Sequence, residues 1–197
     1  MAGLLHSVWR QTACAMNAWP AVTVRVSPGP GPPDSSQPKD TQFDGSNSGK
    51  VILRLPELRH ARREDYALVY ETGAALRAEE LLEDPREVDA IAYARRAEED
   101  CRDGHTWVWR DSRGLCFRSS ISALTADAAQ ISGVYTPPAL RGQGIATRAL
   151  AELCLRLFDR SQHACLFVND VNTPALALYR RLGFEHRAAW MSAFFVR

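Results

Sequence analysis

The sequence lacks a long hydrophobic run: no apolar stretch in its 197 residues approaches the roughly 18 residues that cross a membrane. It also lacks a Cys-x-x-Cys pair, and its five cysteines and five histidines show no metal-ligand spacing, so we expect no metal. The odd number of cysteines argues against a disulfide framework. A net charge of +1 gives no overall reason to expect nucleic acid or a membrane as partner. We therefore expect a cytoplasmic globular protein, as a monomer or a homodimer.

Residues 1–49 differ in composition from the rest of the chain. The stretch 27–49 is dense in Pro, Gly, Ser, Asp and Asn, which cannot bury a core, and we predict a disordered extension or linker over residues 1–49. Residues 1–33 contain no acidic side chain, and apolar residues at 4–9 fall at helical spacing, a pattern that permits an organelle transit peptide. An unstructured extension without a targeting role is the alternative. The folded domain is predicted to comprise residues 50–197.

From residue 50 onward, short apolar runs alternate with segments of helical periodicity. Asp84 followed by Pro85 and then Glu87 is typical of a helix start. Three strands in close succession predict an antiparallel meander. The expected elements are a strand at 51–55, helices at 62–82 and 84–99, strands at 106–110, 115–124 and 128–135, a helix at 145–159, a strand at 164–168, a helix at 173–182 and one or two strands within 184–196. This order, β-α-α-β-β-β-α-β-α-β with an optional last strand, predicts an α/β (α+β) protein with a mixed central sheet.

Residues 134–147 run from a strand through a glycine-rich loop into a helix. Backbone N–H groups at such a helix start lack internal partners, and the helix dipole favours an anion there. A Walker A loop would need a lysine, which this stretch lacks, and a dinucleotide fingerprint would need Gly or Ala where Thr147 stands. Arg141, Gly144 and Ala146 instead fit the pattern Arg-x-x-Gly-x-Gly/Ala without a gap.

A second motif follows over residues 172–184, with Asn172, Tyr179 and Gly183 among its members. Together the two motifs resemble the acetyl-CoA-binding core of the GCN5-related N-acetyltransferase (GNAT) superfamily over roughly residues 128–186. The resemblance implies the GNAT fold and an enzyme that moves an acetyl group from acetyl-CoA to a primary amine. The amine would belong to a small molecule, a protein N-terminus or a lysine.

The resemblance also implies a role for individual residues. Tyr179 would protonate the leaving thiolate as general acid, and Asn172 would bind the cofactor near its pantetheine arm. Backbone groups of Val134, Tyr135 and Thr136 would pair with that arm, and the Tyr135 N–H is nearest by position to the developing oxyanion. The pyrophosphate would be held by residues of the loop and the first helical turn: Arg141, Gly142, Gln143, Gly144, Ile145, Ala146 and Thr147.

Each of the side chains also has a simpler interpretation. Asn172 could merely cap a helix, Tyr179 could be a core residue, and Arg141 could be a solvated loop charge. Their joint spacing favours the functional interpretation.

The sequence does not identify the general base. Many members of the superfamily carry a glutamate on the strand before the loop, where this chain has Gln130 and Ser132. The candidates are a water chain or one of four carboxylates, namely Glu71, Glu79, Glu80 and Asp127. The missing carboxylate favours an alternative function, a non-catalytic acyl-CoA-binding regulatory module, whereas Tyr179 favours catalysis.

The charge is unevenly distributed along the chain. Residues 61–103 carry 13 acidic and 7 basic side chains, a net charge of −6, whereas residues 104–197 carry 6 acidic and 11 basic ones, a net charge of +5. The positive half agrees with a cofactor that carries phosphates. The negative half belongs to the part of the GNAT fold that usually borders the acceptor, so it predicts a preference for cationic amines.

Overall fold

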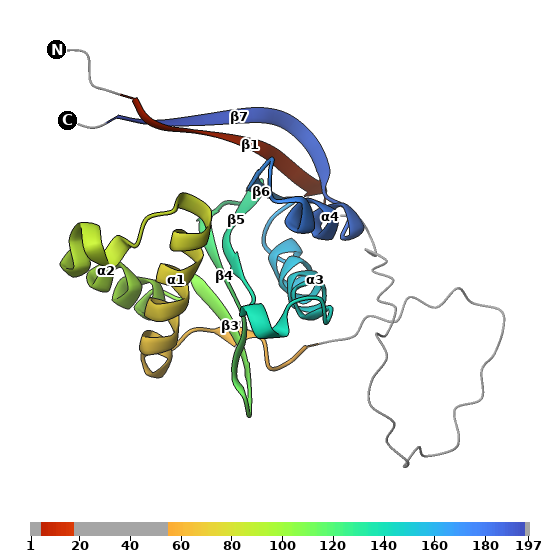
Figure 1. The fold of residues 1–197 in the computed structure, drawn as a ribbon. Coiled ribbons are helices and arrows are strands. Elements are labelled where there is room, and N and C mark those ends of the chain that lie inside the picture. Colours follow the sequence, from red (N-terminus) through yellow and green to blue (C-terminus); the bar gives the residue numbers. More distant parts are fainter. Residues whose placement is uncertain (1–4, 18–54, 196–197) are drawn as a thin grey trace, which may run out of the picture.

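The computed structural model describes residues 5–17 and 55–195, which form one seven-stranded sheet with helices on both faces (Figure 1). Helices α1 (Tyr66–Leu81) and α2 (Pro85–Arg102) lie on one face, and α3 (Ile145–Phe158) and α4 (Thr173–Arg181) lie on the other. The strand order is β2-β3-β4-β5-β6-β1-β7. The strands are β1 (Leu5–Asn17), β2 (Arg59–His60), β3 (Thr106–Asp111), β4 (Gly114–Leu124), β5 (Ala128–Tyr135), β6 (His163–Asn169) and β7 (Glu185–Phe195). The predicted α/β class with a mixed sheet is confirmed.

The centre of the sheet follows the predicted pattern. Strands β3, β4 and β5 form an antiparallel meander, and β5 then pairs with β6 in parallel. The parallel pair is connected through α3, which begins directly after the glycine loop. Tight turns permit the first two connections, whereas a parallel connection needs a crossover long enough to return the chain to the same edge. This crossover places the glycine loop beside the end of β5.

The helices on the first face are anchored by carboxylates at their starts. Asp84 caps α2 by accepting a hydrogen bond from the Arg86 N–H at 2.9 Å, as predicted. Asp65, which precedes α1, is fully buried and pairs with Arg59 at 2.6 Å and with Arg110 at 3.1 Å. Burial alone would raise the pKa of Asp65, but the hydrogen bonds that it accepts lower it overall. This ionised carboxylate therefore fixes the start of α1 against β2 and β3.

The prediction of a disordered segment over residues 1–49 is wrong for Leu5–Asn17. These residues form β1 in the interior of the sheet, antiparallel both to β6 and to β7. The Pro- and Gly-rich composition begins only at residue 27, and the local sequence gives no sign of partners that lie between 146 and 190 residues further along the chain. The remainder of that segment, and the strand predicted at 51–55 apart from Leu55, lie outside the described residues.

The C-terminal end of the domain agrees with the prediction of one or two strands within 184–196. Within the described residues, a single strand, β7, closes the sheet, and its partner is β1 rather than a strand that follows it in sequence. The two strands run alongside each other over most of their lengths (Figure 1). The two-residue strand β2 was not predicted, because so short a segment has no detectable periodicity.

The hydrophobic core is divided unequally between the two faces. The main cluster lies under α3 and α4 and includes the fully buried Leu150, Leu153 and Leu166. A much smaller cluster lies under α1 and α2, and it consists of Ala61, Val69, Cys101, Val108 and Leu115. None of the helices described is both long and apolar enough to span a membrane.

Candidate active site

The candidate site begins where β5 and β6 separate. Their parallel pairing runs from Ala128 opposite His163 to Ile131 opposite Leu166 and then stops, although both strands continue. Beyond this point, among residues 5–17 and 55–195, β5 pairs only with β4, and β6 pairs only with β1. The facing edges of the two strands therefore carry backbone groups without a ladder partner, which an extended ligand could pair with as a strand does. Val134 and Tyr135, predicted to bind the pantetheine arm, lie on this edge of β5.

Two buried polar atoms flank this opening. Thr136 Oγ1 follows the end of β5, and Asn169 Oδ1 lies at the end of β6, and neither has a hydrogen-bond partner within the described residues. Buried polar groups nearly always form hydrogen bonds in native proteins, so two unsatisfied polar atoms at one opening indicate a ligand. Thr136 was predicted to belong to the site. Asn169 was missed, and the available signal was a polar residue at the end of an otherwise apolar strand.

The glycine loop has the backbone conformation that anion binding requires. Gly142 and Gly144 have φ values of 76° and 77°, in the left-handed region that glycine adopts readily. A Cβ at either position would meet nothing within 4 Å, so the backbone is openly accessible there. No side chain caps α3, whose first helical bond runs from the Arg148 N–H to the Gly144 carbonyl. The N–H groups of its first turn, from Ile145 to Thr147, are thus left for an anion.

The Arg141 side chain connects this loop to α1. Its Nε donates to the Thr136 carbonyl at 2.9 Å, and its Nη2 binds the Glu79 carboxylate at 2.8 Å. Its guanidinium also lies 5.6 Å from the centre of the Tyr135 ring. Gln143 donates to another loop carbonyl at 3.1 Å. The Arg141 and Gln143 side chains therefore stabilise the conformation of the loop. Any contact of these two residues with a phosphate would come from their backbone groups.

The two residues singled out in the second motif occupy different environments. Asn172 Oδ1 accepts a hydrogen bond from the Ala175 N–H at 3.2 Å, so this side chain caps α4, the simpler of its two interpretations. Tyr179 is buried in the main core, with its ring 5.8 Å from that of Phe184. Burial, and then the negative charge of Glu80, raise the pKa of Tyr179. The phenol therefore keeps its proton throughout the physiological range.

The influence of Glu80 on Tyr179 connects the two faces of the sheet. Glu80 lies near the end of α1, and Tyr179 lies on α4, on the opposite face (Figure 1). The two groups therefore lie on opposite faces of the sheet, and the negative charge of Glu80 still acts on the phenol of Tyr179.

The structure distinguishes among the four carboxylates considered as bases. Glu71 and Glu79 are each bound by an arginine, at 2.9 Å and 2.8 Å. Asp127 precedes β5, at the end of the strand away from the opening. Glu80 forms no ion pair with the described residues, and partial desolvation followed by repulsion from Glu79 raises its pKa. Of the four, Glu80 therefore combines the lack of an ion pair to a described residue with a raised pKa.

Comparison with known families identifies the class of protein. The sequence matches the family model described as the acetyltransferase (GNAT) family over residues 75–184, which is more than half of the chain. The chain belongs to the GNAT family of acetyltransferases. No curated protein matches it significantly. No group of three or more His, Cys, Asp or Glu side chains that could hold a metal occurs in residues 5–17 or 55–195.

Solved structures share this fold at low sequence identity. A GNAT-family acetyltransferase from Novosphingobium aromaticivorans superposes with a TM-score of 0.60 at 19% identity, over 96% of this chain and 65% of that one. An acetyltransferase from Clostridium acetobutylicum, solved with acetyl-CoA, gives 0.53 at 20%, over 66% and 90% of the two chains. The ribosomal-protein-alanine N-acetyltransferase from Brucella melitensis gives 0.55 at 20%, over 71% and 99%. The chain spans 65% and 58% of the first two similar structures.

Proposed function

We propose that this chain transfers the acetyl group of acetyl-CoA to a primary amine. The observation that carries the proposal is the separation of β5 from β6 beside a glycine loop that opens α3. An extended pantetheine arm would pair with the free edge of β5 at Val134 and Tyr135. Thr136 Oγ1 and Asn169 Oδ1, which lack partners in the part of the chain that the structure describes, would receive polar contacts from the same ligand. The first-turn N–H groups of α3 would hold its pyrophosphate.

Bound acetyl-CoA would supply the thioester that an amine attacks. Glu80 would accept the proton that the amine must lose, because its carboxylate is unpaired within the described residues and its raised pKa makes it a better base. A backbone N–H on the free edge of β5 would stabilise the oxyanion. The neutral Tyr179 hydroxyl would give its proton to the departing sulfur.

The similar structures support this proposal at the level of class. The Clostridium acetobutylicum protein contains acetyl-CoA, and the Brucella melitensis enzyme is named for acetylation of an alanine in a ribosomal protein. We therefore infer acetyl-CoA as donor and an amine as acceptor for this chain.

Tyr179→Phe provides the test, because it keeps the ring and removes the proton donor. General acids typically contribute 10²–10⁴-fold, and a thiolate leaves readily without help, so kcat should fall by roughly ten- to a hundredfold. Coenzyme A affinity should stay within about threefold, the pattern expected when an interaction of the transition state alone is lost. Thiol release over a panel of amines, combined with calorimetric titration of coenzyme A, measures both quantities.

Gly144→Val is the matched variant on the cofactor side. A β-branched residue is strained at a φ of 77°, so this variant should weaken coenzyme A binding first. Wild-type turnover by Tyr179→Phe would show that the tyrosine is structural. Coenzyme A binding without turnover on any amine would instead support the non-catalytic acyl-CoA-binding module.

A further inference from the structure

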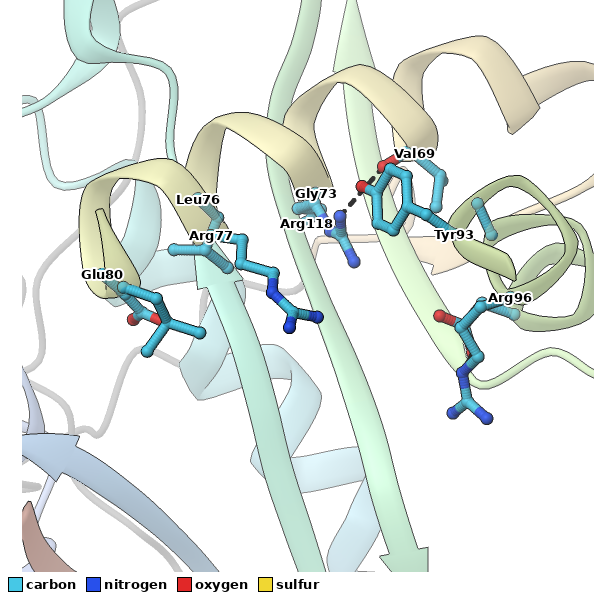
Figure 2. Close-up of a pocket in the computed structure, with 11 residues that line it drawn as sticks. Val69, Gly73, Leu76, Arg77, Glu80, Tyr93, Arg96 and Arg118 are labelled. Carbon is cyan, nitrogen blue, oxygen red and sulfur yellow. Dashed lines mark hydrogen bonds and ion pairs between the residues drawn. The ribbon is translucent and has the colours of Figure 1, made fainter. Parts of the chain in front are cut away.

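A cavity of about 250 Å³ lies between α1, α2 and β4 (Figure 2). Three arginines line it, namely Arg77, Arg96 and Arg118, together with the carboxylates Glu80 and Asp100. Arg96 and Asp100 are paired with each other at 3.1 Å. Arg77, Arg118 and Glu80 remain as the charges that a ligand in the cavity would meet, and two of these three are positive.

Arg118 is buried without a carboxylate directly bonded to it. Its side chain is only 6% exposed, and it forms no ion pair with any residue that the structure describes. The Asp100 carboxylate, which Arg96 already binds, acts on it electrostatically and without an ion pair. Its Nη1 donates to the Val69 carbonyl at 3.0 Å, its Nη2 has a long contact of 3.4 Å with Ser120, and its Nε is buried with no partner in the described ranges. A buried charge without compensation is strongly destabilising, and a guanidinium fork matches a carboxylate. Burial accordingly lowers the pKa of Arg118.

The fold makes room for this guanidinium. Figure 2 shows Arg118 against α1, beside Gly73 and Tyr93. A Cβ at Gly73 would lie 2.6 Å from Nη1 of Arg118 and 2.5 Å from the Tyr93 hydroxyl, so no larger residue fits there. Glycine inside a helix costs about 1 kcal/mol relative to alanine. The chain thus carries an unfavourable residue in α1 where Arg118 needs space.

The cavity adjoins the opening between β5 and β6. Gly133 belongs to the part of β5 that no longer pairs with β6, and a Cβ there would lie 3.7 Å from Nη2 of Arg118. Glu80, the candidate base, lines the same cavity as Arg118. An acceptor that reached Arg118 with one end could therefore present its amine to Glu80 with the other.

We propose that Arg118 binds the carboxylate of the acceptor, which makes the acceptor an amine that also carries an acidic group, such as an amino acid. This inference rests on the proposed function, because it names the acceptor class of the same site. It also replaces the preference for cationic amines predicted from the net charge of residues 61–103. Most of those carboxylates lie outside the cavity, whereas the arginines that line it favour an anion.

The experiment compares acceptors that differ only in their carboxylate. A panel of free amino acids and the corresponding amino acid amides is assayed by thiol release at saturating acetyl-CoA. The wild type should show a kcat/KM for its best amino acid that exceeds that for the amide by about ten- to a hundredfold, the range for a hydrogen bond to a charged group. Arg118→Met should abolish this difference by raising the KM for the amino acid. Its kcat/KM for the amide should stay within about threefold of the wild-type value.

Two further variants test whether the effect is specific. Arg118→Lys keeps the positive charge but lacks the paired donors of a guanidinium, so it should lose part of the preference for the amino acid over its amide. It also serves as the test variant if Arg118→Met does not fold. Arg95→Met is the control, because Arg95 is an exposed arginine of α2 that does not line the cavity, and it should retain the wild-type preference. The thermal midpoint of Arg118→Met should not fall, since the variant removes an uncompensated buried charge.

The outcomes separate this inference from the proposed function. Equal turnover of amino acids and amides by the wild type would overturn the carboxylate assignment and leave acetyl transfer intact. An unchanged preference in Arg118→Met and Arg118→Lys would overturn it as well. Absence of turnover on every amine would overturn the proposed function instead. In that case calorimetric titration of the free protein with the same amino acids decides whether a carboxylate binds through Arg118, and no heat of binding would overturn the inference too.

Discussion

The interior under α3 and α4 is filled with hydrophobic side chains, whereas the interior under α1 and α2 contains a small hydrophobic cluster, a cavity and a buried arginine. The first arrangement fixes the glycine loop and the start of α3, whose backbone donors must stay in place to bind phosphate. The second would leave space and charge for the acceptor that we propose. On these proposals, one sheet carries a rigid face for the cofactor and a hollow face for the acceptor.

Removal of β1 should have the largest effect and should fall mainly on the cofactor face. This strand lies between β6 and β7, and Cys14 belongs to the main core that also holds Tyr179. Typical domains are stable by only about 5–15 kcal/mol, so loss of an interior strand should abolish the cooperative unfolding transition. We expect a chain that starts at residue 18 to show no sharp thermal transition by circular dichroism and no binding of coenzyme A.

A peptide of residues 1–17 offers a control for this deletion. Its addition in trans should restore coenzyme A binding, whereas a peptide of the same composition in scrambled order should not. Hydrogen exchange should show greater loss of protection in α4 than in α1 of the deleted chain. A thermal midpoint within about 2 °C of the full chain would contradict a structural role for β1.

Truncation of one leucine on each face should show the difference in packing directly. Leu153 on α3 is fully buried, and Leu153→Ala should lower the free energy of unfolding by about 2–5 kcal/mol. Leu76 on α1 borders the cavity, so the space that Leu76→Ala leaves merges with a cavity that is already present. This variant should therefore lower the free energy of unfolding by only about 1 kcal/mol or less. Denaturant titration of both variants measures the two values, and equal losses would contradict the comparison.

Replacement of Glu80 should leave the stability of the fold unchanged and should act on turnover alone. Glu80→Gln should lower kcat by about a hundredfold, at the low end for general bases and equivalent to about 2.7 kcal/mol. A base acts only when ionised, and the pKa of Glu80 is raised, so wild-type turnover should fall as the pH drops through that raised value. The variant should lack this acidic limb.

Glu71→Gln is the matched control, since Arg86 already binds that carboxylate. It should keep both the wild-type rate and the acidic limb of the pH profile. A Glu80→Gln enzyme with an unchanged profile would show that the base is a different group.

Local features of the sequence were sufficient for most elements after residue 62. The Asp84 cap and Pro85 start α2 as predicted, because a helix start depends on neighbouring residues alone. The meander of β3, β4 and β5 was likewise predicted, because its turns are short. The position of β1 was not predictable in this way, because its pairing with β6 and β7 joins the two ends of the chain.

The sequence by itself determined the family, the glycine loop and the start of α3, because each depends on residue types at fixed short spacings. Only the tertiary structure decided which of the four carboxylates lines the cavity without an ion pair to a described residue, and that Arg118 is buried against Gly73. Whether a charge is paired or desolvated depends on neighbours that are distant in sequence. Its pKa and its use as a base or an anion site therefore follow from packing, which no local pattern encodes.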